Sequence, residues 1–264
     1  MTVNGGDFVS TACVHRSDWA YCFSSEGTLY FKDGNVTGVQ GALSIANGYA
    51  KVYDGNFKTV QCEQSETGCT SHYGIYIAGE EGEVEAYVYG GTFESAEQVA
   101  ILCGNDNAGG DGGINAKATA TISGGKFTGA PGFDAMRAGK ITGDPHIIGG
   151  DFSSNVSDYV DPAYVCQEKD GRFVVLPRTA ENAVAKIGEA YYETLDKAIG
   201  VVTEGQTITL LGDLTLASPI NVVDKDFVLD LGNATLSNPS GTVFNTMDST
   251  IEIKNGTVKT ANLL

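Results

Sequence analysis

Val88-Tyr89-Gly90-Gly91-Thr92-Phe93 is the stretch that decides the fold, because its pattern returns along the chain. The pattern is an apolar residue, a spacer, Gly or Asp, Gly, any residue and then Phe. It recurs at residues 3–8, 52–57, 122–127 and 147–152. A further copy at residues 31–36 ends in Val instead of Phe, and successive copies end 21 to 36 residues apart. A constant motif at unequal spacing indicates one repeated core that carries loops of different length.

Each copy reads as a strand, a corner and a second strand. Paired glycines permit positive φ and a tight bend, and the runs beside them are typical of pleated strands. One such unit cannot bury its own apolar face, whereas stacked copies align their apolar residues into a continuous column. We therefore predict an all-β solenoid of parallel strands. Its internal column would consist of Phe8, Phe57, Phe93, Phe127 and Phe152.

An antiparallel sandwich is the alternative, because turn signals at short intervals suit that fold as well. Hairpins do not require a shared Phe after each turn, so the recurring Phe favours the solenoid. The two folds differ in the direction of neighbouring strands, which is parallel in the solenoid and antiparallel in the sandwich.

The repeat fades after Phe152, and the organisation of the chain changes there. Asp170-Gly171 lies between two β-rich runs and predicts a hairpin that closes the first stack. Residues 177–182 read as a linker. The chain therefore divides into a first stack over residues 1–176, this linker, and a second β-helix module over residues 183–264.

The second module begins with a pair of strands and the only helix that the sequence predicts, from Thr194 to about residue 202. Leu195, Ala198 and Ile199 share one helical face, and Thr194 is available as the N-cap. We expect this helix to cap the second stack and to shield its first layer from water. Strand-and-turn units follow at residues 212–216, 232–236 and 256–258. Both ends of the sequence lie inside such units, so we expect a longer array that is truncated here.

Composition argues against two classes of partner. The 264 residues are 42% hydrophobic, which is enough for a large core, and 16 basic against 33 acidic residues give a net charge of −17. A negative field of this size repels phosphate backbones and anionic lipid head groups. The sequence also has no run of apolar residues long enough to span a bilayer. We expect neither nucleic-acid binding nor membrane insertion.

Five segments carry a family resemblance. One is Ile148-Gly149-Gly150-Asp151-Phe152-Ser153, which continues to Val160, and the others are residues 184–188, 192–199, 207–213 and 229–232. They resemble repeat modules of large pectin-lyase-like β-helix proteins, which are common in surface proteins of gut Firmicutes and in their phages. The resemblance covers nearly the whole chain and implies a right-handed parallel β-helix in two stacks with one short capping helix. It implies no particular activity, because the family shares a scaffold rather than a reaction.

Nothing in the sequence points to catalysis, and we expect a protein that is not an enzyme. Parallel β-helix hydrolases need clustered carboxylates, and the lyases of that fold resemble one another in using a Ca²⁺-binding Asp cluster with an Arg or Lys base. The sequence has no Asp-Asp pair, no Gly-His-Gly and no Asn-x-Asp, and its arginines lie away from acidic pairs. A polysaccharide lyase or glycoside hydrolase stays open by fold analogy alone.

Two polar loops are candidates for a metal ion or a cross-link. Asp106 and Asp111 lie in a glycine-rich loop whose oxygen atoms suit Ca²⁺, with a solvated insertion as the alternative. No other cofactor is indicated. Cys62 and Cys69 flank a loop that a disulfide would staple, with buried free thiols as the alternative. The histidines are isolated from one another in sequence and are expected as surface or turn residues: His15, His72 and His146.

Exposed aromatic side chains are the remaining candidates for binding. Trp19, Tyr87 and Tyr89 are selected because flat rings offer surfaces suited to sugar rings. Alternation places Tyr87 and Tyr89 on the same side of a strand, opposite Val88. Packing against an inserted loop is the alternative role. Further aromatic candidates for the same solvent face are Tyr21, Tyr30, Tyr73 and Tyr76.

We therefore expect a non-catalytic repeat scaffold, extracellular on the surface of a Gram-positive gut bacterium, that presents loops for adhesion to glycans or host surface proteins. The first alternative is a fibre or spike segment of a phage virion, for which a trimer instead of a monomer would be evidence. The second alternative is a polysaccharide-cleaving enzyme, which would need a carboxylate cluster in a groove.

Overall fold

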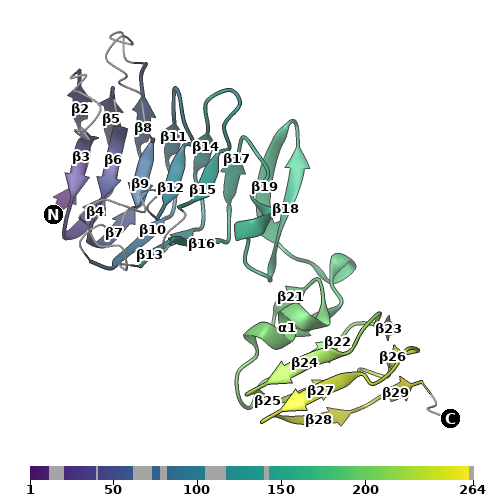
Figure 1. Ribbon diagram of the computed structural model, residues 1–264. Coiled ribbons are helices and arrows are strands. Elements are labelled where there is room, and N and C mark those ends of the chain that lie inside the picture. Colours follow the sequence, from purple (N-terminus) through teal and green to yellow (C-terminus); the bar gives the residue numbers. More distant parts are fainter. Residues whose placement is uncertain are drawn as a thin grey trace. The chain divides into compact units, whose positions relative to one another are not determined.

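The computed structural model describes residues 1–11, 21–39, 41–61, 73–77, 82–104, 117–139 and 143–261. These residues are mostly in β-strands, and contacts within the chain divide it into two compact units. The first unit comprises Met1–Asp161 and Cys166–Leu176, and the second comprises Pro162–Val165 and Pro177–Leu264. Most strand pairs in both units are parallel, which rules out the antiparallel sandwich (Figure 1).

The first unit contains three sheets, and consecutive strands belong to the first, second and third sheet in rotation. The first sheet has the order β1 (Thr2–Val3), β4 (Thr28–Phe31), β7 (Gly48–Val52), β10 (Val84–Val88), β13 (Ala118–Ile122) and β16 (Gly143–Ile147). The second sheet contains β2 (Asp7–Ser10), β5 (Asn35–Gly38), β8 (Asn56–Thr59), β11 (Thr92–Glu94), β14 (Lys126–Thr128) and β17 (Gly150–Phe152). The third sheet contains β3 (Tyr21–Ser25), β6 (Gly41–Ile45), β9 (Ile75–Ile77), β12 (Ile101–Cys103) and β15 (Met136–Ala138).

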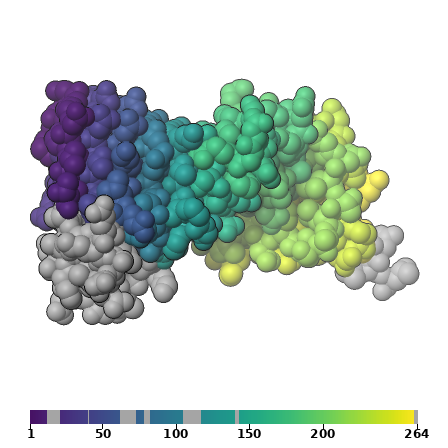
Figure 2. All heavy atoms as spheres, turned by 90° about the horizontal axis from the view of Figure 1, so that it is seen from above, coloured from purple at the N-terminus to yellow at the C-terminus, as the bar shows by residue number. Residues whose placement is uncertain are grey.

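From β1 to β14, each strand therefore pairs in parallel with the strand three places further along the chain. Three successive strands form one layer, and each layer stacks on the next. In Figure 2 the purple, blue and teal bands of the first unit follow one another in sequence order. This stacking is what the repeat predicts, because a single layer leaves its apolar face without a partner.

The recurring Phe residues form an internal column, as the sequence predicts for four of the five. Phe57, Phe93, Phe127 and Phe152 pair in register along the second sheet and are fully buried. Their neighbouring ring centroids lie 4.8, 4.9 and 4.9 Å apart, with the planes within 11° of parallel. Phe8 differs from the prediction, because it lies in the first layer and stays partly exposed.

One motif copy ends in Val36 instead of Phe, and the packing around it shows why the column is not interrupted there. Val36 takes the column position between Phe8 and Phe57. Phe31 occupies the first apolar position of the same motif, where the neighbouring layers have Val3 and Val52. Its buried ring lies 4.8 Å from Phe57 and 6.5 Å from Phe8, so it fills the space that the smaller Val36 leaves.

The second glycine of the motif permits layers to approach closely at the corner. Gly91 has φ +101°, and a Cβ added there would lie 2.9 Å from the carbonyl oxygen of Gly55. That carbonyl accepts a hydrogen bond of 2.8 Å from the amide of Thr92. The glycine is therefore required both by its positive φ and by the carbonyl of the layer below.

A hairpin closes one end of the second sheet, as predicted. β18 (Tyr164–Lys169) and β19 (Arg172–Pro177) are neighbours, and β19 pairs antiparallel with β17. Asp170 and Gly171 both have positive φ, as a two-residue hairpin turn requires. Arg172 donates to Asp151 and to the carbonyl of Phe127, which ties the hairpin to the last two layers. A short 3₁₀ helix, Ser157–Tyr159, precedes the hairpin.

The second unit repeats the rotation of strands over three smaller sheets. One sheet has the order β21 (Ala190–Tyr192), β20 (Ala185–Ile187), β22 (Thr207–Leu210), β25 (Asp226–Asp230) and β28 (Thr250–Lys254). The other sheets are β23 (Leu214–Thr215), β26 (Thr235–Asn238), β29 (Thr257–Thr260) and the pair β24 (Ile220–Val223), β27 (Phe244–Met247). β20 is antiparallel to both neighbours, while β22, β25 and β28 are parallel.

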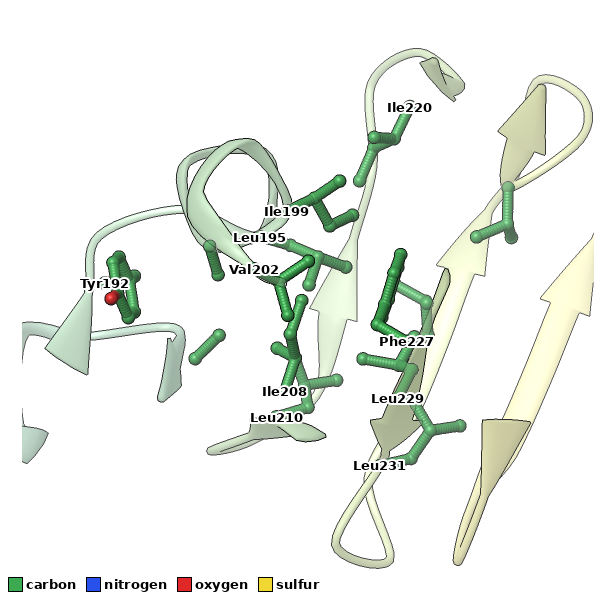
Figure 3. Close-up of a cluster of buried hydrophobic side chains, with 14 of the residues drawn as sticks. Tyr192, Leu195, Ile199, Val202, Ile208, Leu210, Ile220, Phe227, Leu229 and Leu231 are labelled. Carbon is green, nitrogen blue, oxygen red and sulfur yellow. The ribbon is translucent and has the colours of Figure 1, made fainter. Parts of the chain in front are cut away.

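The predicted helix is α1 (Leu195–Val201), and the Thr194 hydroxyl accepts from the amide of Lys197 as its N-cap. Its buried face, Leu195, Ala198 and Ile199, belongs to the same apolar cluster as the first strands of this unit. Figure 3 shows Leu195, Ile199 and Val202 turned toward Ile208 and Phe227. The helix therefore covers the first layer of the second unit and hides its apolar residues from water.

Residues 177–182 contain more structure than the linker that we expected. Pro177 ends β19, and a 3₁₀ helix, Ala180–Asn182, follows with a capping box from Thr179. The Arg178 side chain is only 7% exposed and donates to the Tyr164 carbonyl and to Glu193. Arg178 consequently anchors this otherwise exposed segment to the second unit.

Candidate functional site

The outer face of the first sheet carries a group of tyrosines, which we call the tyrosine face: Tyr30, Tyr49, Tyr53, Tyr87 and Tyr89. Alternation along the strands produces it, since β4, β7 and β10 turn Leu29, Ala50 and Ala86 into the core. The intervening positions point outward. Tyr53 and Tyr89 directly follow β7 and β10 and are 36% and 42% exposed.

The rings of the tyrosine face contact one another across neighbouring strands. Tyr49 lies 6.4 Å from Tyr30 and 5.7 Å from Tyr87. Tyr53 and Tyr89 stack at 5.2 Å with 24° between their planes, and Tyr87 and Tyr89 lie 6.4 Å apart at 12°. These contacts restrict the rings, so that the face is an ordered aromatic surface.

Two lysines interact with these rings. The Lys32 ammonium lies 4.0 Å above the centre of the Tyr53 ring, and Lys51 lies 5.5 Å from Tyr49 and 5.7 Å from Tyr87. Such cation–π distances favour the charged form of the amine. A hydrogen bond to the Tyr49 hydroxyl, the largest cause, raises the pKa of Lys51. Lys51 is therefore cationic throughout the physiological range.

Tyr87 is held by the strand that carries it. Its hydroxyl donates a hydrogen bond of 2.5 Å to the carboxylate of Glu85, which raises the pKa of Tyr87. Glu85 is two residues earlier on the same face of β10. The phenol consequently stays protonated at neutral pH, and its ring orientation is fixed by a charge-assisted hydrogen bond.

Beyond β10 the same outward positions change from aromatic to short and then to charged. Tyr87 pairs in register with Thr121 of β13, and Thr121 pairs with His146 of β16. The adjacent outward column runs from Glu85 through Thr119 to Asp144. The sheet therefore presents tyrosines, hydroxyls and the pair His146 and Asp144 side by side.

His146 lies on the outer surface, as expected, and contacts two carboxylates there. Its Nε2 lies 3.2 Å from Asp144 and its Nδ1 lies 3.2 Å from Asp161. The contact with Asp161 forms because Ile147 and Val160 bridge the strand end to a later segment. Lys117 pairs with Asp144 at 2.7 Å and is the main cause of the lowered pKa of that carboxyl.

A polar pocket of about 390 Å³ opens on this face at the beginning of the strands. It is lined by Gly48, Tyr49, Glu83, Val84, Glu85, Lys117 and Thr119. Aromatic, carboxylate, ammonium and hydroxyl groups thus surround one hollow. Such a mixture suits a polar ligand with many hydroxyl groups better than an apolar one.

The structure brings together two of the predicted site residues, Tyr87 and Tyr89. Trp19, Asp106, Asp111, Cys62 and Cys69 lie outside the described residues. No group of three His, Cys, Asp or Glu side chains within the described ranges could hold a metal ion. Within these ranges the cysteines are free: Cys22, Cys103 and Cys166.

Two tyrosines expected on the solvent face are buried instead. Tyr76 is 1% exposed and Tyr73 6%, because they pack with Val99, Leu102 and Tyr21 on the outside of the third sheet. Sequence reasoning also missed Tyr49, Tyr53 and both lysines. Alignment of the repeat copies would have found Tyr53, since it occupies the position of Tyr89 after the first apolar residue of the motif.

Comparison with protein-family models, with curated proteins and with solved structures finds no match for this chain. Among the described residues, no helix has the length and apolar character needed to cross a membrane. The functional argument consequently depends on the tyrosine face itself.

Proposed function

We propose that the chain is a right-handed parallel β-helix of the pectin-lyase-like type. The rotation of strands among three parallel sheets supports this assignment, because each complete turn of the chain advances by one layer. Connections between parallel strands of one sheet are right-handed in nearly all proteins. The hairpin and α1, which cover apolar layers, fit the way in which solenoids close their ends.

We propose that this β-helix is a non-catalytic scaffold, displayed on a bacterial surface, that binds glycans through the tyrosine face. The observation that carries the proposal is a set of five partly exposed tyrosines on the outer face of one sheet. Tyrosine offers a flat apolar ring to the CH groups of a pyranose and a hydroxyl to its polar edge. Buried packing does not explain Tyr89, which keeps 42% of its surface exposed.

A parallel sheet is a suitable support for such a site. Its strand spacing repeats every 4.7–4.9 Å, and contacts with ring-centroid distances of 5.7 and 5.2 Å hold neighbouring tyrosines in place. Binding therefore requires little ordering of the protein side chains, which lowers the entropic cost of association. A rigid platform of this kind is what an adhesive surface protein needs.

A glycan array probed with the whole chain tests the proposal, followed by titration calorimetry of any ligand found. Tyr89→Ala and Tyr87→Ala should each weaken binding at least tenfold. Tyr191→Ala, on the second unit, is the matched control and should bind like the parent protein. Silence of the array, or equal affinity in all variants, would refute glycan binding at this face. A trimeric mass in solution would favour the virion fibre instead.

A further inference from the structure

We infer that β13 forms the floor of a slot that takes one neutral pyranose ring, with Tyr87 and Tyr89 as its stacking wall. This inference rests on the proposed glycan-binding function and names the ligand class and the residues that select it. Thr119, Thr121 and Ser123 supply the floor, and His146 stands on the opposite side.

Side-chain size along the sheet creates the slot. Thr121 lies in register between Tyr87 and His146, so a short side chain separates two large ones. Ser123 follows β13 as Tyr89 follows β10, and the Ser123 amide donates to the carbonyl of Val88. The outer surface therefore steps down at β13 and rises again at β16.

The wall has one ring face available. Tyr53 stacks on Tyr89 from the β7 side at 5.2 Å. On the β13 side the equivalent position is Ser123, so no aromatic ring among the described residues continues the stack there. The apolar CH face of a pyranose ring can take the place that the next tyrosine would occupy.

The width fits a single sugar ring. β10 and β16 are two strand spacings apart, or about 9.6 Å. A ring that lies about 4 Å from Tyr87 leaves about 5.6 Å to the His146 side. His146 is fixed there, since both of its nitrogens lie 3.2 Å from carboxylate oxygens.

The charges around the floor favour a neutral sugar over an acidic one. Lys117, a cation at this end of the face, is paired with Asp144 at 2.7 Å. Glu83 and Glu85 line the adjoining pocket together with Thr119. A uronic acid would meet these carboxylates, whereas sugar hydroxyls can donate to them and accept from the threonines. Lys51 lies on the other side of Tyr87, in β7.

Filling the slot tests the inference. Thr121→Tyr places a tyrosine in register with Tyr87 on the outer face of the sheet, outside the core, so the fold should persist. Cellohexaose, laminarihexaose, mannohexaose and hexagalacturonate serve as probes in titration calorimetry. We expect at least one neutral hexasaccharide to bind and Thr121→Tyr to weaken it at least tenfold. Ser123→Tyr is the second variant, and Thr92→Tyr, on the outside of the second sheet, is the control that should leave affinity unchanged.

The outcomes separate this inference from the proposed function. Loss of binding in Tyr89→Ala with full binding in both slot-filling variants would overturn the slot and leave the tyrosine face in place. Preference for hexagalacturonate over all three neutral probes would overturn the ligand class. Binding of no probe here and of no glycan on the array would overturn both proposals together. Thermal melts followed by circular dichroism confirm that each variant is folded.

Discussion

Replacing Phe93 by Ala should remove the centre of the internal column and destabilise the first unit by about 4 kcal/mol. Phe93 is fully buried and stacks on Phe57 and Phe127 at 4.8 and 4.9 Å. Burial of a Phe side chain contributes about 1.5–3 kcal/mol, and each stacked pair adds about 0.5–1.5 kcal/mol. These contributions together agree with the usual cost of truncating a core Phe.

Urea unfolding followed by circular dichroism measures this cost. Phe133→Ala is the matched control, because Phe133 is 45% exposed and its removal should cost at most about 1 kcal/mol. A double-mutant cycle sharpens the result. Phe93 and Phe127 are in contact and should couple, whereas Phe57 and Phe152 are three stacking distances apart, share no ring partner and should be additive within about 0.5 kcal/mol. A loss below about 1 kcal/mol for Phe93→Ala, or equal coupling in both pairs, would refute the column as a source of stability.

Three further predictions concern a corner, a carboxyl and a thiol. Gly91→Ala should cost about 1–3 kcal/mol more than Gly132→Ala in thermal melts, because both glycines have positive φ but only Gly91 has a carbonyl oxygen 2.9 Å from the added Cβ; equal costs would contradict the close approach. Asp230 accepts from the Gly232 amide and the Asn255 side chain, which lowers its pKa, so its stabilising contribution is present above about pH 4 and lost as the pH falls through the lowered pKa. Melts at several pH values should show a smaller acid loss for Asp230→Asn than for the parent protein, and parallel curves would argue against it. Burial raises the pKa of Cys103 to about 12, so iodoacetamide at about pH 8 should label this thiol only after unfolding, as peptide mass mapping would show; rapid labelling of the folded protein would contradict its burial.

The repeat motif predicted much of the structure of the first unit, because aligning its copies gives the register between neighbouring strands directly. Once the copies are aligned, Phe57, Phe93, Phe127 and Phe152 must face one column, and the structure confirms this. The partial exposure of Phe8 could not be read from the motif. It depends on position in the stack, and a repeat pattern contains no information on which layer is outermost.

The candidate site was predicted only where strand alternation decides it. Tyr87 and Tyr89 share a face because they are two residues apart at the end of β10 and directly after it. The burial of Tyr76 depends on Tyr21 and Val99, which are distant in sequence. The contact of His146 with Asp161 depends likewise on a bridge formed after the chain has left the first sheet. Such contacts arise from tertiary packing, which local patterns do not encode.

In the layer of Phe31 and Val36, the large and the small side chain of the motif have exchanged positions, and the fold is unchanged. What the layer conserves is the combined volume of two corner positions, so a large and a small side chain can change places and leave the interior filled. Either change alone would leave a void or crowd the interior, which makes the pair an expected site of correlated substitution. A search that demands an aromatic at the final position would pass over this layer. A solenoid that accumulates such exchanges can therefore keep its fold after its sequence motif is no longer recognisable.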